Sequence, residues 1–264
     1  MTAVSVVYDF FHAIAEYREY LKQSVMRDLR KKYKRSSLGY VWSMLNPLLM
    51  MTILAVVFST LMKGKVENYP VFLFCGIIPW GYFNGTIRSC LGTIRQNAKI
   101  IDQVPVPKFI FAVSSAIYNL VDLCLSMVPL IIIMIFTNWP IKASVLYFPM
   151  VMIPLLMMTM GVSLLVAVSN VFFEDTQHLS EVILRAVYFL CPILFPKEML
   201  PEWLVKWIVI NPMFGIIENF RAIFYGGTAP NFELYFINLL GATVFLMFGL
   251  LVFKKADNKF IYFV

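Results

Sequence analysis

The chain alternates long apolar runs with short polar connections. Six runs contain roughly 18 to 28 residues each, and most of them carry no charge. At 1.5 Å per residue, a helix of this length crosses a hydrocarbon layer about 30 Å thick. The runs cover residues 41–62, 70–87, 109–136, 145–169, 179–196 and 234–253. The pattern predicts a single all-α integral membrane domain, residues 1–264, with six transmembrane helices.

Positive charge is concentrated on one side of this arrangement. A dense cationic segment precedes the first apolar run, and each cation would cost about 2.5–3.5 kcal/mol at the centre of a membrane helix. Of the 22 Lys and Arg residues, 16 fall in segments on the side of the two termini and 6 on the other side. The positive-inside rule therefore predicts cytoplasmic termini. The predicted interfacial anchors are Arg27, Arg30, Lys31, Lys34 and Arg35.

Residues 1–35 show the periodicity of an amphipathic helix. Apolar residues recur every three or four positions, at Ile14, Tyr17, Leu21, Val25 and Leu29. Such a helix is expected to lie in the membrane interface. A solvated cytosolic helix remains the alternative.

The inner connection, residues 88–108, is here called the coupling segment. Ile94, Ala98 and Ile101 share one face of a short helix, which the prolines at 105 and 107 end. A rigid element of this kind suits a membrane protein that receives force from a cytosolic partner. The residues predicted to do so are Arg95, Ala98, Lys99, Ile101 and Asp102. The alternative is an ordinary connector that lies on the bilayer.

The outer connection, residues 197–233, contains two apolar stretches that are too short to cross a membrane. The first surrounds Trp207, and the second begins at Asn211-Pro212 and keeps helical spacing as far as Phe224. Irregular backbone at membrane depth needs protein or a water-filled cavity around it. The two stretches are therefore predicted to be re-entrant helices that gate an exit. The predicted gate residues are Trp207, Pro212, Phe220 and Arg221.

One acid and several aromatic residues lie within or beside the apolar runs. Asp122 is near the middle of the third run, where an ionisable group is costly and is a candidate for function. The alternative is that a neighbouring helix holds Asp122, with Asn119 one turn away as a local partner. The aromatic residues can form interfacial belts or can face a passage and stack on sugar rings. The predicted channel residues are Tyr40, Trp42, Trp80, Phe83 and Asp122.

Composition disfavours several other kinds of chemistry. Charged residues make up only 14 % of the chain, against about 25 % in soluble domains. The net charge of +7 comes from cations beside apolar runs, which favours anionic lipid headgroups over nucleic acid. The four cysteines show no CxxC spacing and the two histidines are far apart, so we expect neither a disulfide nor a metal site. Without a GxxxxGK[ST] loop, the chain is not expected to hydrolyse ATP.

Three separated segments carry a family resemblance. They are RDLRKKYKRSSLGYVWSMLNPLLMM from Arg27, FFEDTQHLSEVILRAVYFLCPILFPKEMLP from Phe172 and NPMFGIIENFRAIFYGG from Asn211. In this order they resemble the membrane subunits of ABC-2 type exporters for bacterial polysaccharides, such as O-antigen, capsule or teichoic acid. Glu174-Asp175 departs from the basic-acidic pair that relatives commonly have there, which puts a charge contact with the partner in doubt.

The resemblance implies a homodimer of six-span subunits in the bacterial inner membrane. It also implies two copies of a separate cytosolic ABC ATPase, which bind ATP and Mg²⁺ and contact residues 1–35 and the coupling segment. No cofactor is expected on this chain. The implied function is export of a lipid-linked polysaccharide from the cytoplasm to the outer face of the membrane. The rivals are an ABC-2 exporter of a small hydrophobic compound and an integral membrane transferase, which would need an acidic or histidine cluster at one face.

Overall fold

The computed structural model describes residues 3–33, 39, 41–62, 64–104, 106–209 and 211–262. These residues form helices joined by turns and loops, and no strand occurs among them. The longer helices are α3 (Val41–Met62), α4 (Tyr69–Leu91), α7 (Phe109–Phe136), α8 (Phe148–Phe172), α9 (Thr176–Leu190) and α12 (Phe232–Ala256). Shorter helices are α1 (Ala3–Glu16), α2 (Arg18–Tyr33), α5 (Thr93–Gln96), α6 (Ala98–Gln103), α10 (Glu202–Ile208) and α11 (Pro212–Arg221). The all-helical architecture expected from the sequence is confirmed for these residues.

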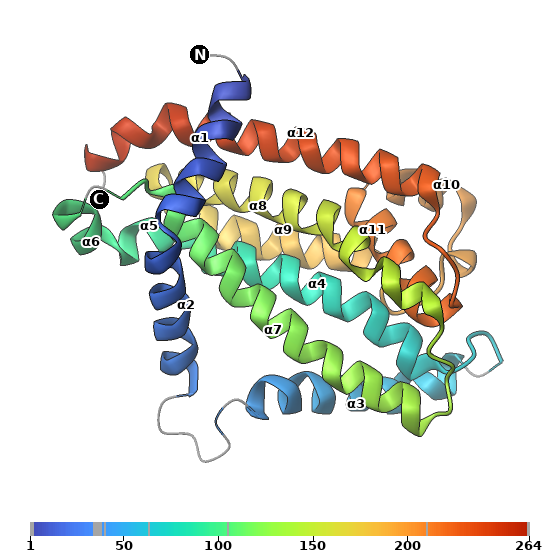
Figure 1. Ribbon diagram of the computed structural model, residues 1–264. Coiled ribbons are helices and arrows are strands. Elements are labelled where there is room, and N and C mark those ends of the chain that lie inside the picture. The colour runs from blue at the N-terminus through green and yellow to red at the C-terminus, as the bar shows by residue number, and fades with distance from the viewer. Residues whose placement is uncertain are drawn as a thin grey trace.

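The longer helices run side by side along one direction (Figure 1). α1 and α2 lie across one end of this bundle, where α5, α6 and the last turn of α12 are also found. α10 and α11 lie at the opposite end. The N-terminal helices and the coupling segment therefore share one end, and the length of the bundle separates them from the outer connection.

Within the part of the chain that the structure describes, four helical segments are long and apolar enough to cross a membrane. They are α4, α7, the joined segment Ala143–Phe172 that contains α8, and α12. α3 carries a shorter apolar stretch, Leu48–Ser59. α9 ends at Leu190, before the Cys191-Pro192 step, and its 15 residues span only about 22 Å. The six-span count thus remains a prediction.

The N-terminal segment forms two helices that meet at Tyr17. The predicted apolar stripe of α2, Leu21, Val25 and Leu29, is buried. A hydrogen bond of 2.9 Å joins Ser24 Oγ to Ser114 Oγ of α7, which fixes α2 against that helix. The apolar stripe of α2 therefore packs on protein. On α1, the exposed apolar side chains are those of Tyr8 and Phe11.

α8 and α12 approach each other closely because glycines face each other. A Cβ atom on Gly161 of α8 would clash with the backbone of Phe245 in α12, and one on Gly249 would clash with the Gly161 carbonyl. Small residues at a helix interface let two backbones come into contact. In a membrane the hydrophobic effect does not drive helices together, so this close packing stabilises their association. This contact fixes α12, whose inner end supports α1.

We predict that Gly161→Leu destabilises the fold because the added side chain has no room beside the α12 backbone. Overpacking of this kind costs about 1–3 kcal/mol. The matched control is Gly81→Ala, where the added Cβ meets nothing within 4 Å, and alanine is the better helix former by about 1 kcal/mol. Thermal unfolding in detergent should show a lower midpoint for Gly161→Leu only. Equal midpoints would mean that α8 and α12 are not in backbone contact.

Candidate functional site

A polar cavity of about 580 Å³ opens where α2 meets the coupling segment and α7. It is here called the inner pocket. Four cations line it, namely Arg27, Lys31, Lys32 and Arg88, and one acid, Asp28. The structure thus brings two predicted interfacial anchors, Arg27 and Lys31, together with the start of the predicted coupling segment. The sequence did not predict this meeting, because 61 positions separate Arg27 from Arg88.

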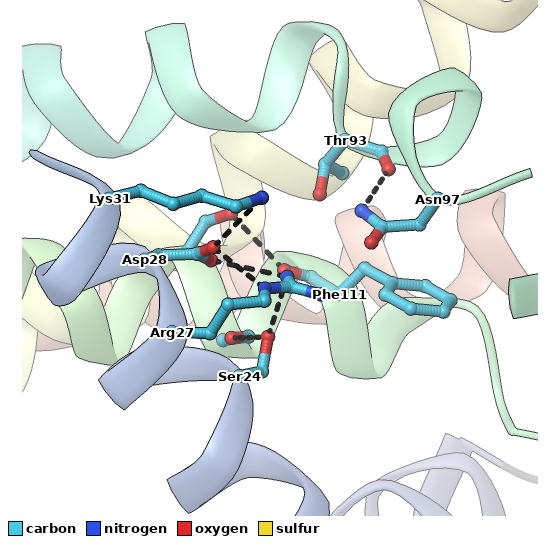
Figure 2. Close-up of polar contacts among 9 residues, drawn as sticks. Ser24, Arg27, Asp28, Lys31, Thr93, Asn97 and Phe111 are labelled. Carbon is cyan, nitrogen blue, oxygen red and sulfur yellow. Dashed lines mark hydrogen bonds and ion pairs between the residues drawn. The ribbon is translucent and has the colours of Figure 1, made fainter. Parts of the chain in front are cut away.

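The charges on α2 are held in place by local contacts. Arg27 Nε donates to Asp28 Oδ1 at 3.0 Å, and Arg27 Nη2 donates to Ser24 Oγ at 3.2 Å. The hydrogen bond with Asp28 raises the pKa of Arg27 above its ordinary value, so the guanidinium stays charged. Lys31 Nζ lies 4.0 Å from Asp28 Oδ1. Figure 2 shows Arg27, Asp28 and Lys31 reaching from α2 towards Thr93 and Asn97.

The opposite wall comes from the end of α4 and the first turn of the coupling segment. Arg88 Nε donates to Asn84 Oδ1 at 3.1 Å, which is a neutral partner. Asn97 Nδ2 donates to the Thr93 carbonyl at 2.7 Å (Figure 2). Ile94, between these polar residues, is buried and anchors the segment in the core. This wall therefore combines one cation with fixed neutral groups.

Asp122 has a partner that the sequence did not identify. Its carboxylate forms an ion pair with Lys32 at the end of α2, and Lys32 Nζ also lies 5.5 Å from the centre of the Tyr118 ring. Asn119, the expected local partner, instead donates to Ser89 Oγ at 3.2 Å and to the Ser115 carbonyl at 2.8 Å. An acid in the middle of α7 is therefore matched by a cation from the N-terminal helix.

The predicted coupling residues differ in what they contact. Arg95 Nη1 donates to Glu174 Oε1 at 2.6 Å, and Arg95 Nη2 donates to the Val171 carbonyl at 3.2 Å. Glu174 belongs to the Glu174-Asp175 pair at which a changed charge contact with the partner was expected, and here it binds the same chain. Lys99 is exposed, and Ala98 and Ile101 are partly buried. The side chain of Asp102 lies outside the described residues.

Among the predicted channel residues that the structure describes, Trp80 and Phe83 lie together in the core. Trp80 and Phe83 of α4 are buried, with ring centres 5.6 Å apart, and Trp80 also lies 5.5 Å from Tyr188 of α9. Trp42, on α3, is 43 % exposed. Tyr40 lies outside the described residues, as do the anchors Lys34 and Arg35, whereas the anchor Arg30 is exposed on α2.

At the end of the bundle that carries α10 and α11, Arg221 is buried in what is here called the outer cluster, together with Glu218, Ile193 and Phe72. Its Nη1 donates to Glu218 Oε1 at 3.0 Å, and its Nη2 donates to the Ile193 carbonyl at 2.9 Å. The guanidinium carbon lies 3.7 Å from the centre of the Phe72 ring. A planar guanidinium suits this combination of fork and stacking contacts. The outer cluster therefore ties α11 to α4 and to the loop after α9.

The other predicted gate residues divide between core and surface. Phe220 is buried, and its ring centre lies 5.9 Å from that of Phe148 at the start of α8. Pro212 begins α11, where Asn211 Oδ1 accepts a hydrogen bond from the Met213 backbone at 3.1 Å. Trp207 on α10 is 70 % exposed. α10 therefore presents apolar surface outwards, whereas α11 is part of the core.

We predict that Arg221→Met strongly destabilises the protein, because it leaves the Ile193 carbonyl without its donor and the largely buried Glu218 carboxylate with only Lys197, whose Nζ lies 3.6 Å from Glu218 Oε2. Removing one partner of a buried pair costs about 3–5 kcal/mol. Arg221→Lys should be intermediate because an ammonium cannot reproduce the fork. The control is Lys206→Met on the exposed face of α10, expected to stay within about 0.5 kcal/mol of the unaltered chain. Chemical denaturation in detergent measures all three, and similar stabilities for Arg221→Met and Lys206→Met would contradict the role of the outer cluster.

Comparison of the sequence with known proteins identifies the family of this chain. The family model described as "ABC-2 type transporter" matches residues 19–225. The chain is 30 % identical over 235 residues to the O-antigen export system permease protein RfbA of Klebsiella pneumoniae, which covers 89 % of this chain and 90 % of the relative. It is 28 % identical over 249 residues to RfbA of Myxococcus xanthus, covering 93 % and 95 %. It is 22 % identical over 237 residues to the polysialic acid transport protein KpsM of Escherichia coli, covering 88 % and 92 %. The chain therefore belongs to the ABC-2 type transporter family.

Proposed function

We propose that this chain is the membrane subunit of an ATP-driven exporter that moves a lipid-linked, O-antigen-like polysaccharide from the cytoplasm to the outer face of the bacterial inner membrane. The family match over residues 19–225 carries this proposal. It is supported by relatives named for O-antigen export and polysialic acid transport, which align over about nine-tenths of both chains.

The proposed unit is a homodimer in which each chain crosses the membrane six times. α3 and α9 supply the two crossings beyond the four long apolar segments, and the non-helical residues 191–196 complete the crossing that α9 begins. Both termini are cytoplasmic in this arrangement. The orientation is supported by the excess of cations at the end of the bundle that carries α2 and the coupling segment.

The ATP-binding partner is proposed to be a separate cytosolic ABC ATPase in two copies, which holds the ATP and Mg²⁺. It would dock at the end of the bundle formed by α1, α2, α5 and α6. The exposed Lys99 on α6 offers a point of contact, whereas Arg95 is committed to Glu174 of the same chain. Closure of the ATPase would then push on α6 and move the helices attached to it, and the outer helices would open the exit.

We predict that the chain co-purifies with an ABC ATPase from its native membrane in mild detergent, and that Lys99→Glu lowers the ATPase activity of this complex about tenfold. Tenfold corresponds to about 1.4 kcal/mol, within the cost of a like-charge contact at an interface. Because Lys99 is exposed, the substitution should leave the fold intact.

The matched control is Lys206→Glu, the same charge reversal on exposed α10 at the opposite end. It should leave co-purification and ATP turnover unchanged. Equal losses for the two variants would rule out a specific coupling role for α6. Purification of the unaltered chain with no ATPase would refute the proposed function.

A further inference from the structure

The inner pocket carries positive charge that its own acids do not balance. Four cations line the pocket against the single carboxylate of Asp28. That carboxylate is already bonded to Arg27 and lies 4.0 Å from Lys31, and Lys32 is paired with Asp122. Among the described residues, the side-chain partner of Arg88 is the neutral Asn84. Cations that converge on one cavity repel each other unless an anion joins them.

The neutral groups of the pocket also suit an anion with several oxygen atoms. Thr93, Gln96 and Asn97 bring hydroxyl and amide groups to the same cavity as the guanidinium of Arg88, whereas the Ser89 hydroxyl already donates to the Gly85 carbonyl. Guanidinium and ammonium groups make short, strong hydrogen bonds to phosphate oxygens, and Arg matches them in fork geometry. The volume of about 580 Å³ lies within the 300–1,000 Å³ of typical ligand sites. A phosphate group would leave room for a sugar beside the Tyr118 ring.

The cations that line the inner pocket face one cavity, and this distinguishes them from the other cations of α2. Lys22 and Arg30 of α2 are exposed and do not line the cavity. They are placed to meet solvent or lipid headgroups, as the charges beside a membrane segment commonly are. Lys31 and Arg88 come from different helices and share one hollow. That arrangement is typical of a binding site for one anionic group.

We propose that the inner pocket binds a phosphate ester, and that in the export cycle this ester is the phosphate or diphosphate linkage between the carrier lipid and its glycan. The assignment rests on the proposed function, because that function supplies a lipid-linked substrate on this side of the membrane. Lys31 and Arg88 bind the phosphate oxygens, and Thr93 and Asn97 complete the wall. Since these last two residues belong to the coupling segment, the bound substrate contacts the element proposed to receive force from the ATPase.

The test measures binding of farnesyl diphosphate, a diphosphate on a short isoprenoid chain, to the full-length protein in phosphatidylcholine nanodiscs. Lys31→Gln and Arg88→Gln should each weaken binding about tenfold, the equivalent of about 1.4 kcal/mol for one lost charge-assisted contact. Both side chains are exposed enough for the fold to tolerate the change, and thermal unfolding checks this. The control Lys22→Gln removes the same charge from the same helix and should change binding less than about twofold. Farnesol, which lacks the diphosphate, should not bind.

Two competitors distinguish the sources of the phosphate ester. If neither inorganic diphosphate nor phosphatidylglycerol in the nanodiscs displaces bound farnesyl diphosphate, the result supports binding of the phosphate linkage of a lipid carrier. Displacement by phosphatidylglycerol would assign the pocket to a bilayer headgroup, and equally tight binding of inorganic diphosphate would assign it to a free anion. Either result would overturn the carrier assignment.

Equal binding by Arg88→Gln and Lys22→Gln would overturn the site itself. Failure of the proposed function is seen separately, in whether the unaltered chain co-purifies with an ATPase. A binding failure with the ATPase present would leave the exporter assignment intact.

Discussion

The cost of placing charge in hydrocarbon is the constraint on which the rest of this structure depends. Each ionised side chain at the centre of a bilayer is expensive, so charges are kept outside or are paired. The cations of α2 stay at one end of the bundle, and α2 lies across that end (Figure 1). Asp122 in the middle of α7 is matched by Lys32, and the buried Arg221 is matched by Glu218. Topology, the inner pocket and the outer cluster all follow from the same penalty.

Because of the position of α2, cations that predict the membrane orientation also line the inner pocket. Its apolar stripe is covered by the bundle, and the Ser24–Ser114 hydrogen bond sets its register on α7. Once α2 is fixed in this way, its charged face must turn towards the coupling segment and the end of α4. An amphipathic helix that only floated in the interface would spread these cations among lipid headgroups. Packing on protein gathers them at one cavity.

Local patterns predicted much of the helical content, and long-range contacts account for most of what they missed. The apolar run 41–62 became a helix with those bounds, and Asn211-Pro212 began α11 as capping rules suggest. The fifth run was predicted to continue to residue 196, but the helix ends at Leu190. The partner of Asp122 lies 90 positions away, and that of Arg95 lies 79 positions away. Periodicity holds no information on such pairs, because it describes which face a residue occupies and not which helix lies opposite.

The coupling segment is tied to the bundle on both sides, which decides how it responds to a push. Near its start, the Leu91 carbonyl at the end of α4 accepts a hydrogen bond from Asn170 of α8 at 2.5 Å. In its middle, Arg95 binds Glu174 and the Val171 carbonyl. At its last residue, Lys108 Nζ lies 3.2 Å from Asp257 Oδ1, beyond the end of α12.

A flexible connector would absorb displacement in its own backbone. A segment held at three points would pass displacement on to α8, to the loop that leads into α9 and to the end of α12. α8 and α12 are in backbone contact through Gly161 and Gly249, so they respond to such a push as one body. α8 packs on α5 of the coupling segment, and α8 and α12 both pack on α11, so this body links the coupling segment to the outer connection.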